Sequence, residues 1–195
     1  MAEGRNAKKK GKLIVISGPS GVGKSTICKE VVKRTGAALS VSVTTRQKSS
    51  QEENGRDYWF VSREEFERRI EKGEFLEYAE VFGNYYGTPR DKTQEFLAAD
   101  RTVILEIDVQ GGRTVIAAFP ETVSIFIMPP KTDELAKRLD VRGRDSAETA
   151  AQRLAKANDE IAAAWRIYKH IVVNDELEKA INEVIKIIQE SGDKK

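Results

Sequence analysis

The segment at residues 18–26 constrains the fold of this chain more than any other part of it. It matches the pattern G-x-x-x-x-G-K-[ST], in which a glycine-rich loop wraps phosphate groups with its backbone N–H groups. The apolar run at 13–16 predicts a buried parallel strand before the loop, and residues 27–34 predict a helix after it. A loop that opens a helix favours anions, because the helix dipole adds partial positive charge there. The residues expected to bind a nucleotide phosphate tail are Gly18, Pro19, Ser20, Gly21, Val22, Gly23, Lys24, Ser25 and Thr26.

Two side chains of this loop carry charge or a metal-binding group. Lys24 is expected to reach the β- and γ-phosphates, and the Ser25 hydroxyl is expected to ligate Mg²⁺. A second apolar run, at residues 102–108, predicts a strand that ends in carboxylates. Its last residue, Asp108, has the position of an acid that emerges at the carboxyl end of the sheet beside the phosphate loop.

Charge and rare residue types exclude several classes of function. The 33 basic and 31 acidic side chains nearly cancel, so nothing in the charge balance indicates a nucleic-acid or membrane partner. The single histidine, His170, excludes a multi-histidine metal site and a Ser-His-Asp triad, and is expected at a strand entrance. The single cysteine, Cys28, is expected to be a packed core thiol in a reducing cytoplasm. Residues 1–11 are expected to form a solvated tail, and no apolar run long enough for a membrane span occurs.

The order of predicted elements indicates a parallel α/β core with an inserted lobe. Strands alternate with helices over most of the chain, which predicts a sheet covered on both faces. Residues 40–90 depart from this alternation, with a half-buried strand at 39–45, a hairpin signal at Asn54-Gly55 and a turn signal at Gly83-Asn84. A capping box from Ser62 to Glu65 opens a helix inside this lobe. Inserted lobes of this kind usually carry the substrate.

Three arginines predict a mobile lid near the phosphate loop. Arg138 and Arg142 precede a glycine hinge at Gly143, and Arg153 follows on a long alanine-rich helix that starts near Ser146. Such arginines could close on phosphate groups. The last strand ends at Asn174-Asp175, and Asp175 is expected to cap the helix at 177–188.

Taken together, these motifs resemble the guanylate kinase family over essentially the whole chain from residue 12 to about 188. The resemblance lies in the loop at 16–26, the Thr-Thr-Arg at 44–46 and the segments 54–58, 83–88, 106–111, 138–143 and 173–175. It implies an α/β fold with a P-loop core, a five-stranded parallel sheet flanked by helices, a mixed β/α lobe for the nucleoside monophosphate and a helical lid. The implied boundaries are a tail at 1–11, a core at 12–39, 91–137 and 157–190, a GMP lobe at 40–90 and a lid at 138–156.

The same resemblance implies an activity. It implies transfer of a phosphoryl group from ATP to GMP with Mg²⁺, in purine nucleotide metabolism in the cytoplasm, by a monomer or homodimer with no nucleic-acid or membrane partner. The catalytic residues that it implies are Lys24, Arg142 and Arg153. The residues implied for the ATP side, beyond the loop, are Arg138, Asn174 and Asp175. The residues implied to bind GMP are Ser42, Arg46, Tyr58, Glu77, Tyr86, Thr88 and Asp108.

The implied base-binding residues agree with the chemistry of guanine. Guanine presents two adjacent donors, N1–H and the 2-amino group, and the carboxylate of Glu77 could accept from both. Adenine offers no proton on N1, so a buried carboxylate would be left without its donor and could discriminate by about 10⁴ or more. Tyrosine hydroxyls and the planar fork of Arg46 are suitable donors to the GMP phosphate.

One position departs from the family pattern. Relatives commonly have Thr-Thr-Arg-x-Pro-Arg-x-Gly-Glu, whereas this chain has Ser49 in place of the second arginine. The neighbouring Lys48 offers a point charge instead of a bidentate fork, and it points the other way in an extended segment. We therefore expect weaker GMP binding than in relatives with both arginines, or a changed acceptor preference.

Two alternative functions fit parts of the pattern. A guanylate-kinase-like module binds phosphorylated protein segments without catalysis, but such modules typically have degraded phosphate loops, whereas Lys24 and Ser25 are present here. An enzyme that phosphorylates another nucleoside monophosphate or a sugar phosphate would keep the loop and change the acceptor site. Glu77 with Thr88 favours guanine.

Overall fold

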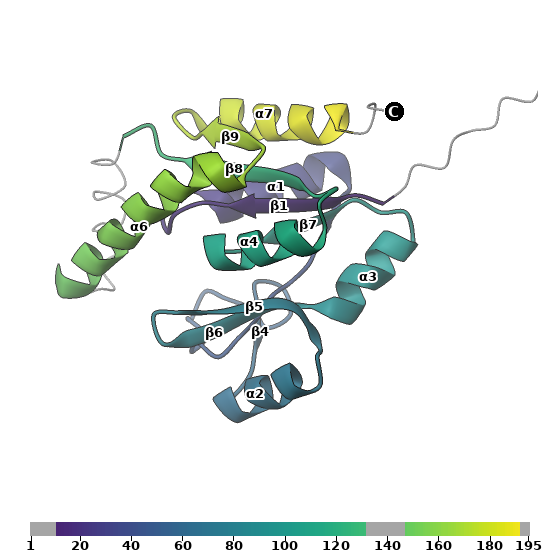
Figure 1. Ribbon diagram of the computed structural model, residues 1–195, viewed down its shortest axis with the longest axis vertical. Helices are drawn as coiled ribbons and strands as arrows, with labels where there is room; N and C mark the ends of the chain where they lie inside the picture. Colours follow the sequence, from purple (N-terminus) through teal and green to yellow (C-terminus); the bar gives the residue numbers. More distant parts are fainter. Residues whose placement is uncertain (1–10, 132–146, 192–195) are drawn as a thin grey trace, which may run out of the picture.

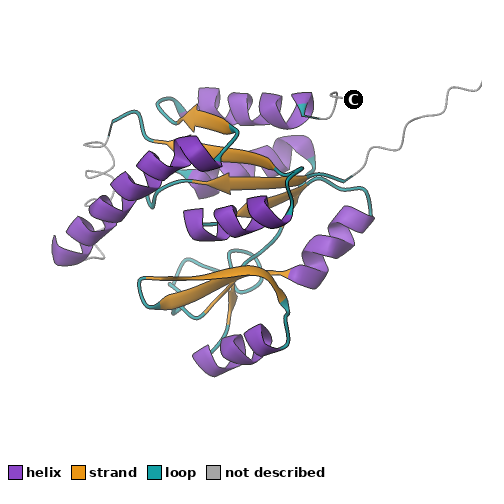
Figure 2. Cartoon of the chain, viewed as in Figure 1, coloured by secondary structure: helices purple, strands orange, loops and turns teal. Residues whose placement is uncertain are grey.

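The structure is a computed structural model that describes residues 11–131 and 147–191. It contains a central five-stranded parallel sheet and a smaller four-stranded mixed sheet beside it (Figure 1). Helices cover both faces of the central sheet (Figure 2). This arrangement confirms the expected α/β class with a five-stranded parallel core and an additional mixed lobe.

The central sheet has the strand order β2-β7-β1-β8-β9, and every neighbouring pair is parallel. Its strands are β1 (Leu13–Ser17), β2 (Ala38–Leu39), β7 (Val103–Glu106), β8 (Val123–Met128) and β9 (His170–Val173). All five residues of β1 are buried, as expected for a middle strand covered on both faces. The helices that cover this sheet are α1 (Lys24–Thr35), α3 (Arg90–Ala98), α4 (Val109–Ala118), α6 (Ala147–Ile167) and α7 (Leu177–Glu190).

Alternating side chains of β1 serve two separate cores. Ile14 and Ile16 point to the face covered by α1 and α7, where they join one apolar cluster. Leu13 and Val15 point to the opposite face, where residues of α3, α4 and α6 form a second cluster. Because all of these strands run in the same direction, their carboxyl ends meet at one edge of the sheet, where the phosphate loop lies.

The smaller sheet has the order β4-β3-β6-β5 and its own core. Its elements are β3 (Val43–Thr44), β4 (Trp59–Phe60), β5 (Phe75–Val81), β6 (Asn84–Pro89) and the helix α2 (Arg63–Glu71). The Ser62 hydroxyl accepts a hydrogen bond from the Glu65 N–H, so Ser62 caps α2 as expected, while the Glu65 carboxylate pairs with Arg68 and Arg69. Phe66 of α2 is fully buried and stacks on Phe75, with 4.4 Å between ring centroids.

Two strand predictions in this region were wrong. The expected strand at 39–45 is split, because Leu39 belongs to the central sheet and Val43 to the smaller one. The intervening residues cross between the sheets, and the Ser40 hydroxyl lies 3.1 Å from the Thr93 hydroxyl. The chain turns at Gly55, where φ is +82°, yet β3 and β4 are parallel, so the hairpin expected at Asn54-Gly55 does not form. A true hairpin joins β5 and β6 through Phe82 and Gly83, both with positive φ, as in a type I′ turn.

One helix start differs from the sequence-based expectation. The N-cap of α7 is Glu176, so Asp175 does not cap that helix. The shift arises because a local capping pattern cannot say which of two neighbouring residues is the last before the helix. In α4, Asp108 is the N-cap, and Gly111 and Gly112 lie inside the helix.

The rare residues lie where the sequence predicted them. Cys28 is buried among the apolar residues between α1 and the sheet, and burial raises the pKa of its thiol. His170 is the first residue of β9. Across the two described ranges, no helix combines the length and the apolar character needed to cross a membrane.

Candidate active site

The phosphate loop is shaped by glycines with positive φ. Gly18, Gly21 and Gly23 have φ of +150°, +84° and +98°, values that residues with a Cβ rarely adopt. A Cβ on Gly18 would also collide with the carbonyl of Ile127 in the neighbouring strand β8. Gly23 is the N-cap of α1, so the loop presents the helix N-terminus to the cavity described next.

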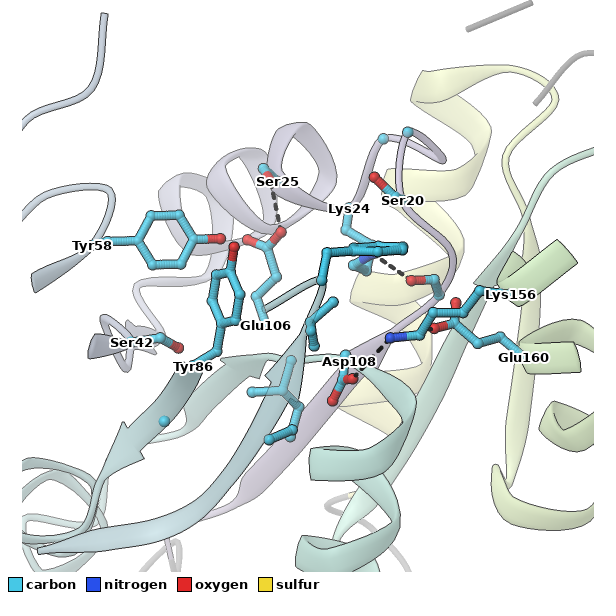
Figure 3. A pocket seen from close by; sticks show the side chains of 18 of the residues that line it. Ser20, Lys24, Ser25, Ser42, Tyr58, Tyr86, Glu106, Asp108, Lys156 and Glu160 are labelled. Carbon is cyan, nitrogen blue, oxygen red and sulfur yellow. Dashed lines mark hydrogen bonds and ion pairs between the residues drawn. The ribbon is translucent and has the colours of Figure 1, made fainter. Parts of the chain in front are cut away.

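A cavity of about 270 Å³ lies between the loop and the smaller sheet (Figure 3). It is lined from the core by Lys24, Ser25 and Glu106, and from the smaller sheet by Ser42, Tyr58, Glu77 and Tyr86. The Lys24 ammonium donates hydrogen bonds to the carbonyls of Gly18 and Pro19, and burial lowers its pKa. One cavity thus contains the predicted phosphate-binding lysine and several predicted acceptor-binding residues.

The predicted metal ligand Ser25 has an acidic neighbour. Its hydroxyl lies 2.6 Å from Oε1 of Glu106, the last residue of β7. The acid that contacts Ser25 is therefore Glu106, whereas Asp108, which the sequence favoured, lies two residues beyond the end of β7 and caps α4. Within the described part of the chain, no cluster of three or more His, Cys, Asp or Glu side chains could hold a metal ion. The pair nevertheless fits Mg²⁺, which takes one or two protein oxygens and completes its shell with phosphate oxygens and water.

Glu77 is a buried carboxylate that lines the cavity. It lies on β5, opposite Thr88 of β6, and is 6% exposed. The Thr88 hydroxyl donates a 2.5 Å hydrogen bond to its Oε1. Burial raises the pKa of Glu77 to about 7, the Thr88 hydrogen bond opposes this shift, and the nearby Asp108 charge adds to it. The Glu77 carboxylate is thus largely removed from water and can accept further hydrogen bonds from a ligand.

Helix α4 begins against this carboxylate. A Cβ on Gly111 would overlap the Glu77 carboxylate, so only glycine leaves room for the acid. Asp108 caps the same helix, with its Oδ1 accepting from the Gly111 N–H at 2.9 Å. Its Oδ2 is buried and has no hydrogen-bond partner in the described structure. Two acids, one on β5 and one at the start of α4, therefore face the same end of the cavity.

The predicted phosphate subsite is partly assembled. Ser42, Tyr58 and Tyr86 line the cavity, with 5.9 Å between the two tyrosine ring centroids. Arg46 forms a two-pronged ion pair with Glu52, at 2.6 and 3.1 Å, and its guanidinium lies 5.5 Å from the centre of the Tyr58 ring. Hydrogen bonding to Arg46 lowers the pKa of Glu52 to about 2. Glu52 therefore stays ionised and fixes the orientation of Arg46.

The segment that departs from the family pattern forms a tight loop around Glu52. The Ser49 N–H donates to Glu52 Oε2 at 2.9 Å, and the Lys48 ammonium donates to the Glu52 carbonyl at 3.0 Å. Lys48 is exposed. The Lys48 ammonium thus contacts the loop backbone. This contact does not support the idea that Lys48 replaces the missing arginine.

Two cavity residues on α6 were not predicted. Lys156 and Glu160, one helical turn apart, both line the cavity (Figure 3). Burial raises the pKa of Glu160 to about 7, although the charges of Lys156 and Lys24 oppose the shift. The sequence places a lysine and a glutamate at i and i+4, a pattern typical of a solvated helix face, so the signal was present but favoured the wrong environment.

The remaining predicted residues lie at the edge of the site or outside the described residues. Asn174 is buried and donates to the Val22 carbonyl at 2.7 Å, so its side chain braces the phosphate loop. Asp175 is exposed. Arg138 and Arg142 lie outside the described residues, and Arg153 lies on α6 with a side chain that is likewise not described. Their roles stay predictions.

Comparison with known sequences gives consistent matches over nearly the whole chain. The family model described as guanylate kinase matches residues 10–191. The chain is 49% identical over 182 residues to a guanylate kinase of Symbiobacterium thermophilum, which covers 93% of this chain and 86% of the relative. It is 51% identical over 172 residues to a guanylate kinase of Thermosynechococcus vestitus, covering 88% of this chain and 90% of the relative.

Comparison with solved structures gives the same result. The fold is similar to the crystal structure of guanylate kinase from Anaplasma phagocytophilum, with a TM-score of 0.82 and 35% identity, over 96% of this chain and 89% of that one. A gluconokinase from Sinorhizobium meliloti is similar with a TM-score of 0.52 at 15% identity, over 95% of each chain. That second likeness concerns the fold alone.

Proposed function

The chain belongs to the guanylate kinase family, and on this premise we propose that it transfers the γ-phosphoryl group of ATP to GMP, giving ADP and GDP. The observation that carries the proposal is the buried carboxylate of Glu77, which accepts a hydrogen bond from Thr88 and lines the same cavity as Lys24. Glu77 selects the acceptor base, and Lys24 holds the phosphates of the donor. The active site is thus built from both sheets.

Selection of guanine follows from the burial of Glu77. Its carboxylate is removed from water, so a base must supply the hydrogen bonds that water no longer gives. Guanine supplies two adjacent N–H donors, whereas adenine leaves the carboxylate facing an unprotonated nitrogen. The Thr88 hydroxyl already donates to one oxygen of Glu77 and so fixes the plane of the carboxylate.

Phosphoryl transfer needs alignment and charge neutralisation more than covalent help. Lys24 would move from the loop carbonyls to the β- and γ-phosphates, and Ser42, Arg46, Tyr58 and Tyr86 would hold the GMP phosphate. Ser25 and Glu106 would hold Mg²⁺. The chemistry that Mg²⁺ supplies there, when bound, is neutralisation of charge on the phosphate oxygens. Arg142 and Arg153 are proposed to stabilise the transferred group, with Arg138, Asn174 and Asp175 on the ATP side.

We infer a cytoplasmic role in purine nucleotide metabolism from the family and from Cys28, a single buried thiol that requires no oxidising compartment. A monomeric or homodimeric state stays a prediction. The two rival functions are not favoured, because the chain shares about half of its residues with relatives described as guanylate kinases.

The proposal is tested by measuring ADP release with GMP, dGMP, AMP, CMP and UMP as acceptors. We expect GMP and dGMP to be preferred over AMP by about 10⁴ in kcat/KM. Glu77→Gln should remove most of this preference, because an amide presents an N–H to one of the two guanine donors. Glu80→Gln is the matched control, since Glu80 lies on the same strand with an exposed side chain. Comparable turnover of AMP and GMP by the unaltered protein would refute the proposal.

A further inference from the structure

Lys156 lines the cavity and lies close to three parts of the molecule. Its ammonium lies 3.8 Å from Asp108 Oδ2 at the start of α4 and 3.8 Å from Glu160 Oε1 on its own helix. It also lies 5.2 Å from the centre of the Phe82 ring, in the turn between β5 and β6. A lysine on a solvated helix face has no such set of contacts, and this side chain is only 30% exposed.

The oxygen that Lys156 faces lacks a hydrogen bond. Asp108 Oδ1 accepts from the Gly111 N–H, but Oδ2 is buried and unpartnered in the part of the chain that the structure describes. The Lys156 ammonium is too far for a hydrogen bond at 3.8 Å, so it supplies charge and leaves the lone pairs of Oδ2 free. A buried acceptor in this state is suited to a donor from a ligand.

Guanine has a donor left over for this oxygen. Its 2-amino group carries two hydrogens, and a carboxylate that also accepts from N1–H can engage only one of them. Asp108 and Glu77 line the same cavity, and Asp108 Oδ2 has no hydrogen-bond partner among the described residues, so it could accept the second hydrogen once a base is bound.

We propose that Lys156 is a specificity-determining positioning residue, which holds Asp108 Oδ2 toward the guanine 2-amino group. The proposal rests on the proposed function. Lys156 also contacts the ring of Phe82, the residue that directly follows β5, the strand that carries Glu77. The Lys156 ammonium on α6 thus contacts one base-binding acid, Asp108, and the turn that follows the strand of the other.

The test compares GMP with inosine monophosphate, which carries hydrogen in place of the 2-amino group. Lys156→Met should lower kcat/KM for GMP about tenfold through KM, as expected for weakening one hydrogen bond to a charged group. It should leave kcat/KM for inosine monophosphate within about twofold, so the preference for GMP falls about tenfold. Lys156→Arg should retain the preference, because it restores the charge.

Lys186→Met is the matched control, since Lys186 also has a glutamate four residues on at 3.8 Å, but on α7 and away from the cavity. It should keep the original preference. The preference is a ratio within one preparation, so partial unfolding of a variant does not alter it. Equal losses for both nucleotides, an unchanged preference in Lys156→Met, or an effect confined to the KM of ATP would overturn the proposal. Failure of the proposed function would appear separately, as absence of GMP turnover in the unaltered protein.

Discussion

Because Ser49 stands where the family pattern has a second arginine, the loop at 46–52 offers the acceptor phosphate a single arginine, Arg46. Arg46 is oriented by Glu52, and Ser49 donates its backbone N–H to the same carboxylate. Lys48 is turned toward the loop carbonyl of Glu52. The structure therefore gives no cation from this loop that takes the place of the second guanidinium of the family pattern.

We predict that Ser49→Arg lowers the KM for GMP by about tenfold, which corresponds to one added charge-assisted hydrogen bond of about 1.4 kcal/mol. The KM for ATP should not change. Ser50→Arg is the control, because Ser50 is the exposed neighbour and adds the same charge in a different direction. Steady-state kinetics with GMP as the varied substrate measures both. An equal gain in the two variants would mean that only net charge matters, and no gain in Ser49→Arg would mean that another group already fills the role.

The raised pKa of Glu77 predicts a pH dependence of GMP recognition. Its pKa is raised to about 7, so the carboxyl of the free protein becomes protonated as the pH falls below 7. A protonated carboxyl presents an O–H to the guanine donors, and kcat/KM for GMP should fall by up to about tenfold per pH unit below that value. The pH profile of kcat/KM measures this limb.

The nucleotide phosphate also titrates near pH 6, so a second experiment is needed to assign the acidic limb to Glu77. Substitution of Thr88 provides it. Thr88 donates to Glu77 and holds the pKa of its carboxyl lower than burial alone would. Thr88→Val removes this donor, so the acidic limb should move to higher pH, whereas Thr88→Ser should leave it in place. If the acidic limb of the kcat/KM profile does not move in Thr88→Val, it reports the titration of a group other than Glu77.

At the scale of elements, α4 contains two adjacent glycines that a helix would normally avoid. Alanine at an interior helix position is about 1 kcal/mol more favourable than glycine. Gly111 faces the Glu77 carboxylate, and Gly112 faces the Tyr168 and Ser17 hydroxyls. The two positions therefore test two different packing contacts of one helix.

We predict that Gly111→Ala raises the KM for GMP by about a hundredfold or more, because the added methyl displaces the Glu77 carboxylate and costs about 3 kcal/mol of binding. Binding of an ATP analogue should change little. Gly112→Ala should act mainly on stability, since its methyl collides with Tyr168 under the sheet. Titration calorimetry and thermal unfolding distinguish these outcomes. A Gly111→Ala protein with normal GMP affinity would show that Glu77 can move without loss.

At the scale of the molecule, the sequence predicted those features that depend on neighbouring residues. The glycine-rich loop at 18–26, the helix N-cap at Ser62 and the class of the fold follow from local pattern, and the structure confirms these three. The crossing at 40–42 was missed, because alternation of apolar and polar residues is the same whether a strand stays in one sheet or passes to another. Lys156 and Glu160 were missed because their spacing does not say what packs against the helix.

The two sheets have separate apolar cores, which predicts two units of stability. Phe66, Phe75 and Val43 form the core of the smaller sheet, apart from the two clusters of the central sheet. GMP is proposed to bind mainly to the smaller sheet and ATP to the central one. Damage to the smaller core should therefore affect one substrate more than the other.

We predict that Phe66→Ala, at a cost of about 3–5 kcal/mol, abolishes GMP binding while an ATP analogue still binds. Phe66 is fully buried and stacks on two rings, so its loss removes the centre of that core. Amide exchange should accelerate in β3, β5, β6 and α2 and stay slow in β1 and β8. Phe126→Ala is the control, because this equally buried phenylalanine lies in the central sheet, and its loss should weaken binding of the ATP analogue more than binding of GMP. If Phe66→Ala instead lowers both affinities in proportion and exchange rises uniformly, the sheets unfold as one unit, and binding of each substrate is coupled to the stability of the whole chain.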